Sequence, residues 1–268
     1  MIDFHNHVVY NIDDGAKDLQ TSIEMIKKAS SMGISSIVNT VHYNHPLMKY
    51  KFPDFNFIDN QIDEINSSLK DEKINMKIYN SAEVYFDSKI LDFIDNKNII
   101  IGQKYMLIEF DFNILPKNYE HILFELQLNG ITPIIAHPER YRFVHNDYSI
   151  IKKWIDKDYK LQVNCGSLLK RFGNQSYYSA TKILENGNAH LIGSDAHNNN
   201  RRNFCIKDAI SLIKNNFNNG SDKVLIDNAY NLLKGEILNE CPSLISKKPN
   251  ILKKIKNWLI KQNYYKVL

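Results

Sequence analysis

Histidine and carboxylate side chains recur along this 268-residue chain with spacings that suit metal binding. His5 and His7 are two residues apart, and so are Asp195 and His197. In an extended strand, residues two apart point to the same side, so each pair can hold one ion. Four further candidates each stand at the end of an apolar run: His42, Glu83, Glu109 and His137. The pattern predicts a metal site.

The type of ligand narrows the choice of metal and of chemistry. Nitrogen and oxygen ligands without cysteine suit Mn²⁺, Zn²⁺ or Fe, and they argue against a structural thiolate zinc site. Eight ligands exceed the needs of one ion, so two or three divalent ions fit better, some of them bridged by a carboxylate. Such clusters lower the pKa of a bound water and hold both oxygens of an in-line displacement at phosphorus.

A second pattern suggests another route to the same chemistry. In "NCGSLLKR", Cys165 and Arg171 have the spacing of a thiol phosphatase loop, in which a thiolate attacks phosphorus and the arginine holds the phosphate. However, Phe172 stands where those enzymes place Ser or Thr, and the segment is poor in the glycines that cradle phosphate. Chance also yields this spacing readily. We therefore expect Cys165 to be dispensable.

Seven apolar, strand-like segments position the candidate ligands. They span 1–8, 34–42, 77–84, 105–110, 131–137, 160–165 and 189–197. Helix-like segments lie at 18–32, 55–70, 118–129, 147–157 and 176–186, and further helices follow residue 201. This alternation predicts one α/β domain with a parallel sheet, either closed as a barrel or open and doubly wound. In a barrel, the carboxyl ends of the strands converge on one face, where the ligands would meet.

Composition excludes several classes of protein. The chain is 43% hydrophobic and 24% charged, which is an ordinary globular balance, and its net charge of +4 is too small to indicate nucleic-acid binding. Three widely spaced cysteines argue against a disulfide framework. No secretory leader opens the chain, and no apolar run approaches the roughly 18 residues that span a bilayer. We expect a soluble cytoplasmic protein that binds no nucleic acid.

The last segment differs from the rest. We expect a barrel domain over 1–245, followed by a strongly basic amphipathic helix or tail over 246–268. One face of this helix would carry Ile251, Leu252, Ile255, Trp258 and Leu259. The helix either packs on the barrel with its lysines in solvent, or rests on an anionic membrane or a partner protein.

Taken in order, the motifs resemble the polymerase-and-histidinol-phosphatase (PHP) superfamily. They are "DFHNH", "IDDGAKDL", "NTVHYNHP", "SAEVYF", "LIEF", "IIAHPERYRF", "QVNCGSLLKRFG" and "LIGSDAH". The likeness is greatest to the bacterial PHP-type protein-tyrosine phosphatases of capsule and exopolysaccharide clusters, of which "HPERY" and "IDDGAKDL" are specific signs. It runs from residue 1 to about residue 235.

The resemblance implies a fold, a cofactor and an activity. The fold is a distorted (β/α)7 barrel of the PHP type, with the metal site at the C-terminal ends of the strands. The cofactor is a cluster of two or three divalent ions, typically Mn²⁺, with Fe or Zn²⁺ as alternatives. The activity is hydrolysis of phosphotyrosine by a metal-bound hydroxide. The usual substrate is a membrane-associated, autophosphorylating bacterial tyrosine kinase that controls polysaccharide export.

Carried onto this sequence, the ligands of the family coincide with the residues already found at the strand ends. They are His5, His7, His42, Glu83, Glu109, His137, Asp195 and His197.

Phosphoryl transfer also needs positive charge on the phosphate oxygens. Arg140 lies three residues after His137 and is predicted to hold phosphate; its alternative is an ion pair with Glu139 or another acid. Of Arg201 and Arg202, the family pattern favours Arg202, and the alternative is a solvated loop charge.

Three other features each admit two interpretations. Asp14 either orients a ligand or protonates the leaving phenolate, or else it forms a turn or helix cap with Gly15. His45 is either a further ligand or, as we expect, a loop histidine. The aromatic loops 42–55 and 110–116 either wall in a tyrosine ring or pack at the barrel rim.

We therefore predict a metal-dependent, cysteine-independent protein-tyrosine phosphatase. The main alternative keeps the metals and takes a small metabolite such as histidinol phosphate. A nuclease, and a regulator without activity that binds its kinase through the basic tail, are further alternatives.

Overall fold

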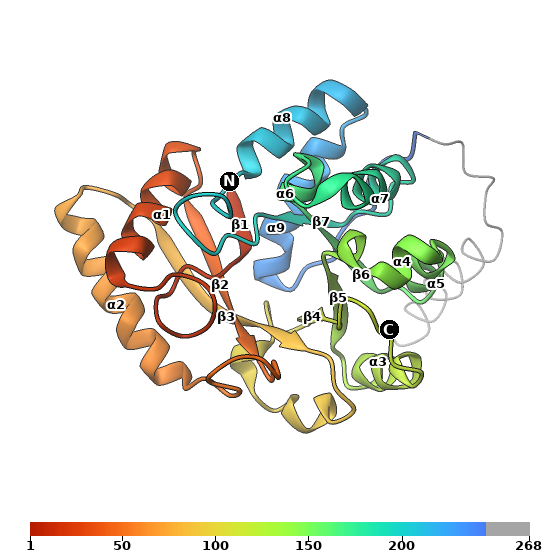
Figure 1. Cartoon of the computed structure of the whole chain (residues 1–268), viewed down its shortest axis with the longest axis horizontal. Helices are drawn as coiled ribbons and strands as arrows, with labels where there is room; N and C mark the ends of the chain where they lie inside the picture. Colours follow the sequence, from red (N-terminus) through yellow and green to blue (C-terminus); the bar gives the residue numbers. More distant parts are fainter. Residues whose placement is uncertain (245–268) are drawn as a thin grey trace, which may run out of the picture.

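The computed structural model describes residues 1–244, so the tail helix predicted over 246–268 lies outside the described residues. Seven parallel strands form one sheet in sequential order. They are β1 (Ile2–Asn6), β2 (Ser36–Tyr43), β3 (Lys77–Tyr85), β4 (Tyr105–Glu109), β5 (Thr132–Ala136), β6 (Lys160–Asn164) and β7 (Leu191–Gly193). A parallel bridge between Asn6 and Ala196 joins the two ends of the sheet. The sheet is a nearly closed barrel, which confirms the predicted (β/α)7 architecture (Figure 1).

Helices surround the barrel on its outside (Figure 1). They are α1 (Leu19–Ser31), α2 (Phe55–Asp71), α3 (Tyr119–Leu128), α4 (Arg142–Asn146), α5 (Ser149–Asp156), α6 (Cys165–Leu168), α7 (Gly173–Glu185) and α8 (Ile206–Phe217). The five predicted helices correspond to α1, α2, α3, α5 and α7. Between β3 and β4 the chain forms two short 3₁₀ helices, Ile90–Phe93 and Lys97–Ile99, instead of an α-helix. The alternation of strand and α-helix is therefore interrupted at this position.

Local sequence explains where the first helices begin. The side chain of Asp18 accepts a hydrogen bond from Thr21 N at the start of α1, and Asp54 accepts one from Asn56 N at the start of α2. Both are acceptors that satisfy N–H groups left unpaired in the first turn. On α1, Ile23 and Ile26 are buried, as the predicted periodicity requires.

Several predicted strands end earlier in the structure than expected, and two of them are followed by a bend in the backbone. The run 189–197 yields only β7, Leu191–Gly193, and the run 131–137 yields β5, which ends at Ala136. The reason is the backbone: Asp195 has φ 51° and His137 has φ 30°, in the left-handed region that a strand cannot contain. These two candidate ligands therefore lie in turns just beyond the strands.

The barrel interior is apolar below the candidate ligands. Glu83 is in register with Leu107, and Leu107 with Ile134, so the three side chains share the inner face of the sheet. Leu107 and Ile134 belong to a small apolar cluster that includes residues of α9 (Ser221–Lys234), a helix that packs against β1 and β7. The larger apolar cluster lies between the strands and the outer helices. The candidate ligands thus lie above a layer of buried, packed apolar side chains.

Among residues 1–244, no helix combines the length and the apolar character needed to cross a membrane.

Candidate metal centre

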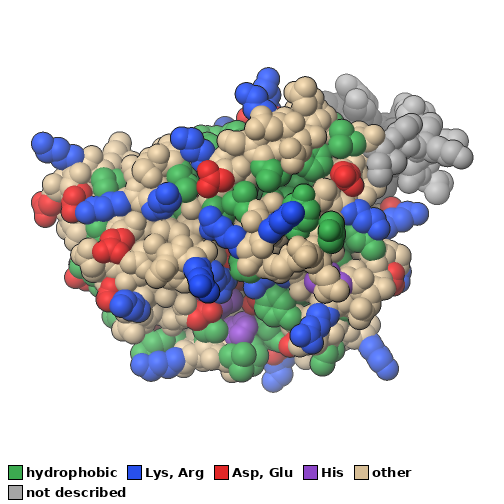
Figure 2. Space-filling model, turned by 45° about the horizontal axis from the view of Figure 1, so that its top comes forward, with side chains coloured by type: hydrophobic (Ala, Val, Ile, Leu, Met, Phe, Trp, Pro, Cys, Tyr) green, Lys and Arg blue, Asp and Glu red, His purple; other side chains and the backbone are tan. Residues whose placement is uncertain are grey.

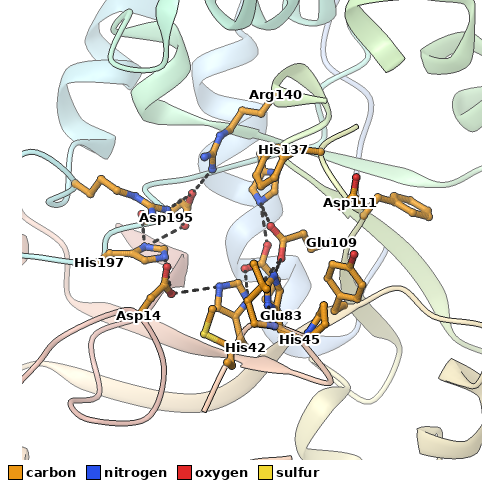
Figure 3. A pocket seen from close by; sticks show the side chains of 17 residues that line it. Asp14, His42, His45, Glu83, Glu109, Asp111, His137, Arg140, Asp195 and His197 are labelled. Atoms are coloured by element: carbon orange, nitrogen blue, oxygen red, sulfur yellow. Dashed lines mark hydrogen bonds and ion pairs between the residues drawn. The ribbon is translucent and has the colours of Figure 1, made fainter. Parts of the chain in front are cut away.

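The predicted ligands converge at the carboxyl ends of the strands, around a cavity of about 340 Å³ (Figure 3). Six of them line this cavity, and His5 and His7 lie buried beneath it. All eight side chains are buried. Figure 2 shows histidine side chains in a hollow on one face, with Lys and Arg side chains nearby.

Glu83 is the centre of the cluster. Its Oε2 lies 3.2 Å from His5 Nε2, 3.4 Å from His7 Nε2 and 3.5 Å from His42 Nδ1. Its Oε1 lies 3.0 Å from His137 Nε2. A carboxylate with histidines on both oxygens has the position of a ligand that bridges two ions.

The donor set fits divalent cations. Among its buried atoms, His5 Nε2, His7 Nε2, His42 Nδ1 and Glu109 Oε2 have no hydrogen-bond partner. Leaving such groups buried and unpaired is costly, and a cation would satisfy them. Burial and the nearby charge of Glu83 also raise the pKa of Glu109 to about 8. A bound cation would relieve this crowding of two acids.

The ligand atoms fall into overlapping groups that are each compact enough for one ion. They are His5, His7 and Glu83; Glu83, Glu109 and His137; His42, His45 and Glu109; and His7, Asp14, His42 and His197. Within each group the atoms lie within 4.8 Å of one another. This arrangement fits a cluster of two or three ions better than a single one.

Hydrogen bonds from behind the cluster fix the orientation of two histidines. Gln162 Oε1 accepts from the backbone N–H of His137 at 3.3 Å, which identifies this atom as the amide oxygen. It lies 2.9 Å from His5 Nδ1, so that nitrogen must carry the proton and His5 Nε2 presents its lone pair to the cluster. His7 Nδ1 is held in the same way by Asp13 Oδ2, at 2.7 Å.

Strand β6 contributes no candidate ligand, yet it supports three of them. Gln162 contacts His5 and His137, and its Nε2 donates to Asn164 Oδ1 at 3.4 Å. Asn164 Nδ2 in turn donates to Asp195 Oδ2 at 2.8 Å. These two amides were not among the predicted site residues. The available signal was the alternation of polar Lys160, Gln162 and Asn164 with apolar residues along the strand.

Asp14 lies among the candidate ligands and contacts two of their imidazoles, which fits the predicted role of orienting a ligand. Its Oδ1 is 3.4 Å from His42 Nε2 and 3.3 Å from His197 Nε2 (Figure 3). Burial would raise its pKa, but hydrogen bonds with these two histidines hold that pKa well below its usual range. The turn with Gly15 is formed instead by Asp13, whose Oδ1 accepts from Gly15 N at 2.9 Å.

Gly15 cannot carry a side chain without disturbing the site. A Cβ at this position would lie 2.5 Å from the Cβ of His7 and 2.3 Å from its carbonyl oxygen. The glycine therefore lets the 11–15 loop close over His7.

His45, expected to be an ordinary loop histidine, also lines the cavity. Its Nδ1 accepts a hydrogen bond from Leu47 N at 3.2 Å. A neutral imidazole has only one lone pair, so the Nε2 of His45 carries the proton. This nitrogen lies 3.6 Å from Glu109 Oε2. The geometry therefore suits His45 as a hydrogen-bond donor to a bound molecule better than as a metal ligand.

The two predicted arginines also line the cavity. Arg140 Nη1 donates to Asp195 Oδ2 at 2.9 Å, and Arg202 Nη2 donates to the same oxygen at 3.0 Å. Burial would raise the pKa of Asp195, but Arg202 and His197 hold it well below its usual range. Arg201, in contrast, is exposed and does not line the cavity.

Of its alternative partners, Arg140 pairs not with Glu139 but with another acid, Asp195. Glu139 Oε1 accepts instead from Asn164 N at 3.0 Å and from Ser167 Oγ at 2.6 Å. The guanidinium of Arg140 lies 4.8 Å from the ring of Phe112 and 4.3 Å from that of Phe172. These two rings hold it by cation–π contact.

Cys165 and Arg171 do not form a phosphate loop. Cys165 is fully buried at the start of α6, and burial raises the pKa of its thiol well above the usual range. Arg171 Nη1 donates to the carbonyl oxygens of Arg201, at 3.4 Å, and Asn203, at 3.2 Å. Arg171 therefore stabilises the loop that carries Arg202, and it does not line the cavity itself.

The aromatic loops divide between the two predicted roles. From these loops Leu47 and Phe112 line the cavity, beside Tyr85 at the end of β3. Tyr43 and Phe52 instead pack at the rim, with ring centroids 5.3 Å apart.

Comparisons with known proteins agree with this site. The family model for capsular polysaccharide synthesis, CpsB/CapC, matches residues 1–234. The chain is 31% identical over 244 residues to the tyrosine-protein phosphatase YwqE of Bacillus subtilis (strain 168), covering 90% of this chain and 95% of that protein. It is 33% identical over 209 residues to the putative tyrosine-protein phosphatase CapC of Staphylococcus aureus, covering 77% of this chain and 81% of that protein.

A solved structure has the same fold. It comes from work on YwqE from Bacillus subtilis and CpsB from Streptococcus pneumoniae, which are described as unique metal-dependent tyrosine phosphatases. It superposes with a TM-score of 0.84 and 30% identity, covering 92% of this chain and 100% of the other. With a family match over nearly the whole described barrel, and relatives that align along most of their length, the chain belongs to the CpsB/CapC family of capsular polysaccharide synthesis.

Proposed function

We propose that this protein is a metal-dependent protein-tyrosine phosphatase. The observation that carries the proposal is the convergence of eight nitrogen- and oxygen-bearing ligands and two arginines on one cavity. The names of the relatives YwqE and CapC give the substrate class, because both are tyrosine-protein phosphatases or putative ones.

The cofactor is a cluster of two or three divalent ions, for which Mn²⁺ is favoured and Fe or Zn²⁺ are alternatives. The ligands would be His5, His7, His42, Glu83, Glu109, His137, Asp195 and His197, with Asp14 added from its geometry. When bound, divalent ions supply an acidified water and neutralise charge on the phosphate. In this role Asp14 is no longer needed as an acid for the leaving group.

The remaining polar groups of the cavity hold the phosphate. Arg140 and Arg202 each carry five N–H donors, and only part of these is used on Asp195. The others can grip the phosphate oxygens. His45 Nε2–H adds a neutral donor from the opposite wall. Stabilising charge on these oxygens lowers the barrier to hydrolysis.

The walls suit the ring of a tyrosine. Leu47, Tyr85 and Phe112 offer apolar and aromatic surface beside the polar floor. A volume of about 340 Å³ also lies within the range of about 300–1,000 Å³ that is usual for small-ligand sites.

The natural substrate would be a phosphotyrosine protein, and we favour a membrane-associated bacterial tyrosine kinase that regulates capsule or exopolysaccharide synthesis. Such a kinase would present its phosphotyrosines in the cytoplasm, where we place this protein. A contact of residues 246–268 with the membrane or with the partner remains a prediction.

The test is hydrolysis by the full chain before and after chelation. We compare a phosphotyrosine peptide, histidinol phosphate and single-stranded DNA, and then restore Mn²⁺, Fe²⁺ or Zn²⁺ separately. We expect preference for the peptide, loss of activity with chelator and the best recovery with Mn²⁺. Activity that is indifferent to chelator would refute the metal mechanism, and faster turnover of histidinol phosphate would refute the substrate class.

A further inference from the structure

A second hollow adjoins the metal cavity. It measures about 240 Å³ and lies between the 11–14 turn and the 47–50 loop. It is lined by Asn11, Ile12, Asp13, Asp14, Leu47, Met48, Lys49 and Tyr50. Asp14, Leu47 and Met48 line both spaces, so this hollow, here called the flank groove, continues the metal cavity toward the surface.

The outer part of the flank groove is apolar and unusually exposed. The side chain of Leu47 is 84% exposed, and that of Tyr50 is 42% exposed. Exposed apolar residues are normal when single, but here they stand together at the mouth of a site. This placement points to a molecule that covers them when the site is in use.

The available charge of the flank groove is positive. Its acids are already engaged: Asp13 with His7 and with the backbone N–H of His42, and Asp14 with the imidazole nitrogens of His42 and His197. Lys49, in contrast, is exposed and makes no ion pair within residues 1–244. Its Nζ lies 4.8 Å from the ring of Tyr50.

We propose that the flank groove binds the residues next to the phosphotyrosine of a polypeptide substrate, and that it selects a flank with an acidic side chain beside an apolar one. The proposal rests on the proposed function and specifies the substrate of that same site. A phosphotyrosine within a chain continues on both sides, so its backbone must leave the cavity over the rim. Leu47, Met48 and Tyr50 would cover the apolar flanking side chain, and Lys49 would attract the acid.

The test uses the full chain and three substrates: a phosphotyrosine peptide with Glu and Leu as neighbours, the same peptide with Lys in place of Glu, and free phosphotyrosine. We expect the acidic peptide to have the highest kcat/KM. Lys49→Glu should reduce kcat/KM for the acidic peptide about fivefold and leave free phosphotyrosine unchanged, because only the peptide reaches position 49.

Lys77→Glu is the matched control. Lys77 is also exposed, and its Nζ lies 4.6 Å from the ring of Tyr79, but it begins β3 at the end of the barrel opposite to the site. It should change none of the three rates. Two outcomes would contradict the proposal. One is equal kcat/KM for the acidic and basic peptides. The other is an equal loss of kcat/KM on the peptide and on free phosphotyrosine in Lys49→Glu.

A binding measurement separates failure of this inference from failure of the proposed function. If neither the peptides nor free phosphotyrosine is hydrolysed, the proposed function fails. Fluorescence anisotropy with peptides that carry a non-hydrolysable phosphotyrosine mimic then still tests the flank groove. The inference is supported if the acidic peptide binds more tightly than the basic one and Lys49→Glu removes this difference. Binding that the variant does not change would overturn it.

Discussion

At the scale of single residues, Arg140 shows how a proposed phosphate-binding group is held in place before substrate arrives. Phe112 and Phe172 lie against its guanidinium, and Asp195 accepts one of its N–H groups. Gly166 makes this possible, because a Cβ there would lie 2.6 Å from the ring of Phe172. An arginine held in this way loses less conformational freedom when phosphate binds.

Phe172→Leu should therefore weaken substrate binding without removing a catalytic group. A cation–π contact contributes about 0.5–2 kcal/mol, so we expect KM to rise about two- to thirtyfold. The kcat should change less, because Arg140 itself remains. Steady-state kinetics on free phosphotyrosine measures both constants. An unchanged KM would show that Phe172 does not position Arg140 for substrate binding.

Cys165→Ser gives the complementary result for the thiol. Because the thiol is buried and its pKa is raised well above the usual range, it is not a thiolate at neutral pH. We expect hydrolysis to stay within about threefold of the unchanged protein, with a modest loss of thermal stability for a polar oxygen in an apolar site. Loss of activity in a variant that remains folded by circular dichroism would restore the cysteine mechanism.

At the scale of elements, β6 supports candidate ligands that lie on β1 and in the turns after β5 and β7. Its amides contact His5, His137 and Asp195, and they determine which nitrogen of His5 faces the cluster. Removing partners of this kind typically reduces metal affinity by about 10–100-fold.

Gln162→Leu should therefore lower the affinity for Mn²⁺ by about tenfold or more, measured by isothermal titration calorimetry on the chelated protein. Gln162→Glu is the matched variant, because it keeps an oxygen that accepts from His5 Nδ1, and it should retain most of the affinity. If both variants bind Mn²⁺ like the unchanged protein, β6 does not orient the ligands. If both lose binding equally, the decisive group is the Nε2–H that Gln162 donates to Asn164, which both variants lack.

The strands of the barrel show which parts of the site could be predicted from the sequence and which could not. His42, Glu83 and Glu109 stand at the ends of apolar runs, so strand periodicity and parallel topology were sufficient to bring them together. The roles of Gln162 and Phe172 depend on what lies across the barrel, and no local pattern records that. The same holds for Asp14 and His45, whose nearest partners come from other strands and loops. The bends at His137 and Asp195 were missed because left-handed backbone at a non-glycine residue leaves no clear sequence signal.

At the scale of the whole molecule, the barrel closes weakly between its first and last strands. Between β1 and the turn after β7 there is one bridge, Asn6 to Ala196, and two backbone hydrogen bonds of 2.8 Å, from His7 N to Ala196 O and from Asp195 N to His5 O. Candidate ligands stand on both sides of this seam. His5 Nε2 and His7 Nε2 each lie 3.7 Å from Asp195 Oδ1. Ions bound here would link the two ends of the sheet.

Metal removal should therefore lower the thermal stability of the whole barrel as well as its activity. A ligand at about 1,000 times its Kd stabilises the folded state by about 4.1 kcal/mol, which corresponds to a rise in Tm on the order of 10 °C for a domain of this size. We expect this difference in Tm between the Mn²⁺-loaded and the chelated protein in differential scanning calorimetry.

Two variants test whether this difference arises at the seam. His5→Ala should shrink the difference, because it removes a candidate ligand at the seam. His121→Ala, which changes an exposed histidine of α3 outside the site, should leave the difference intact. Equal Tm values with and without metal in the unchanged protein would mean that no ion links the seam.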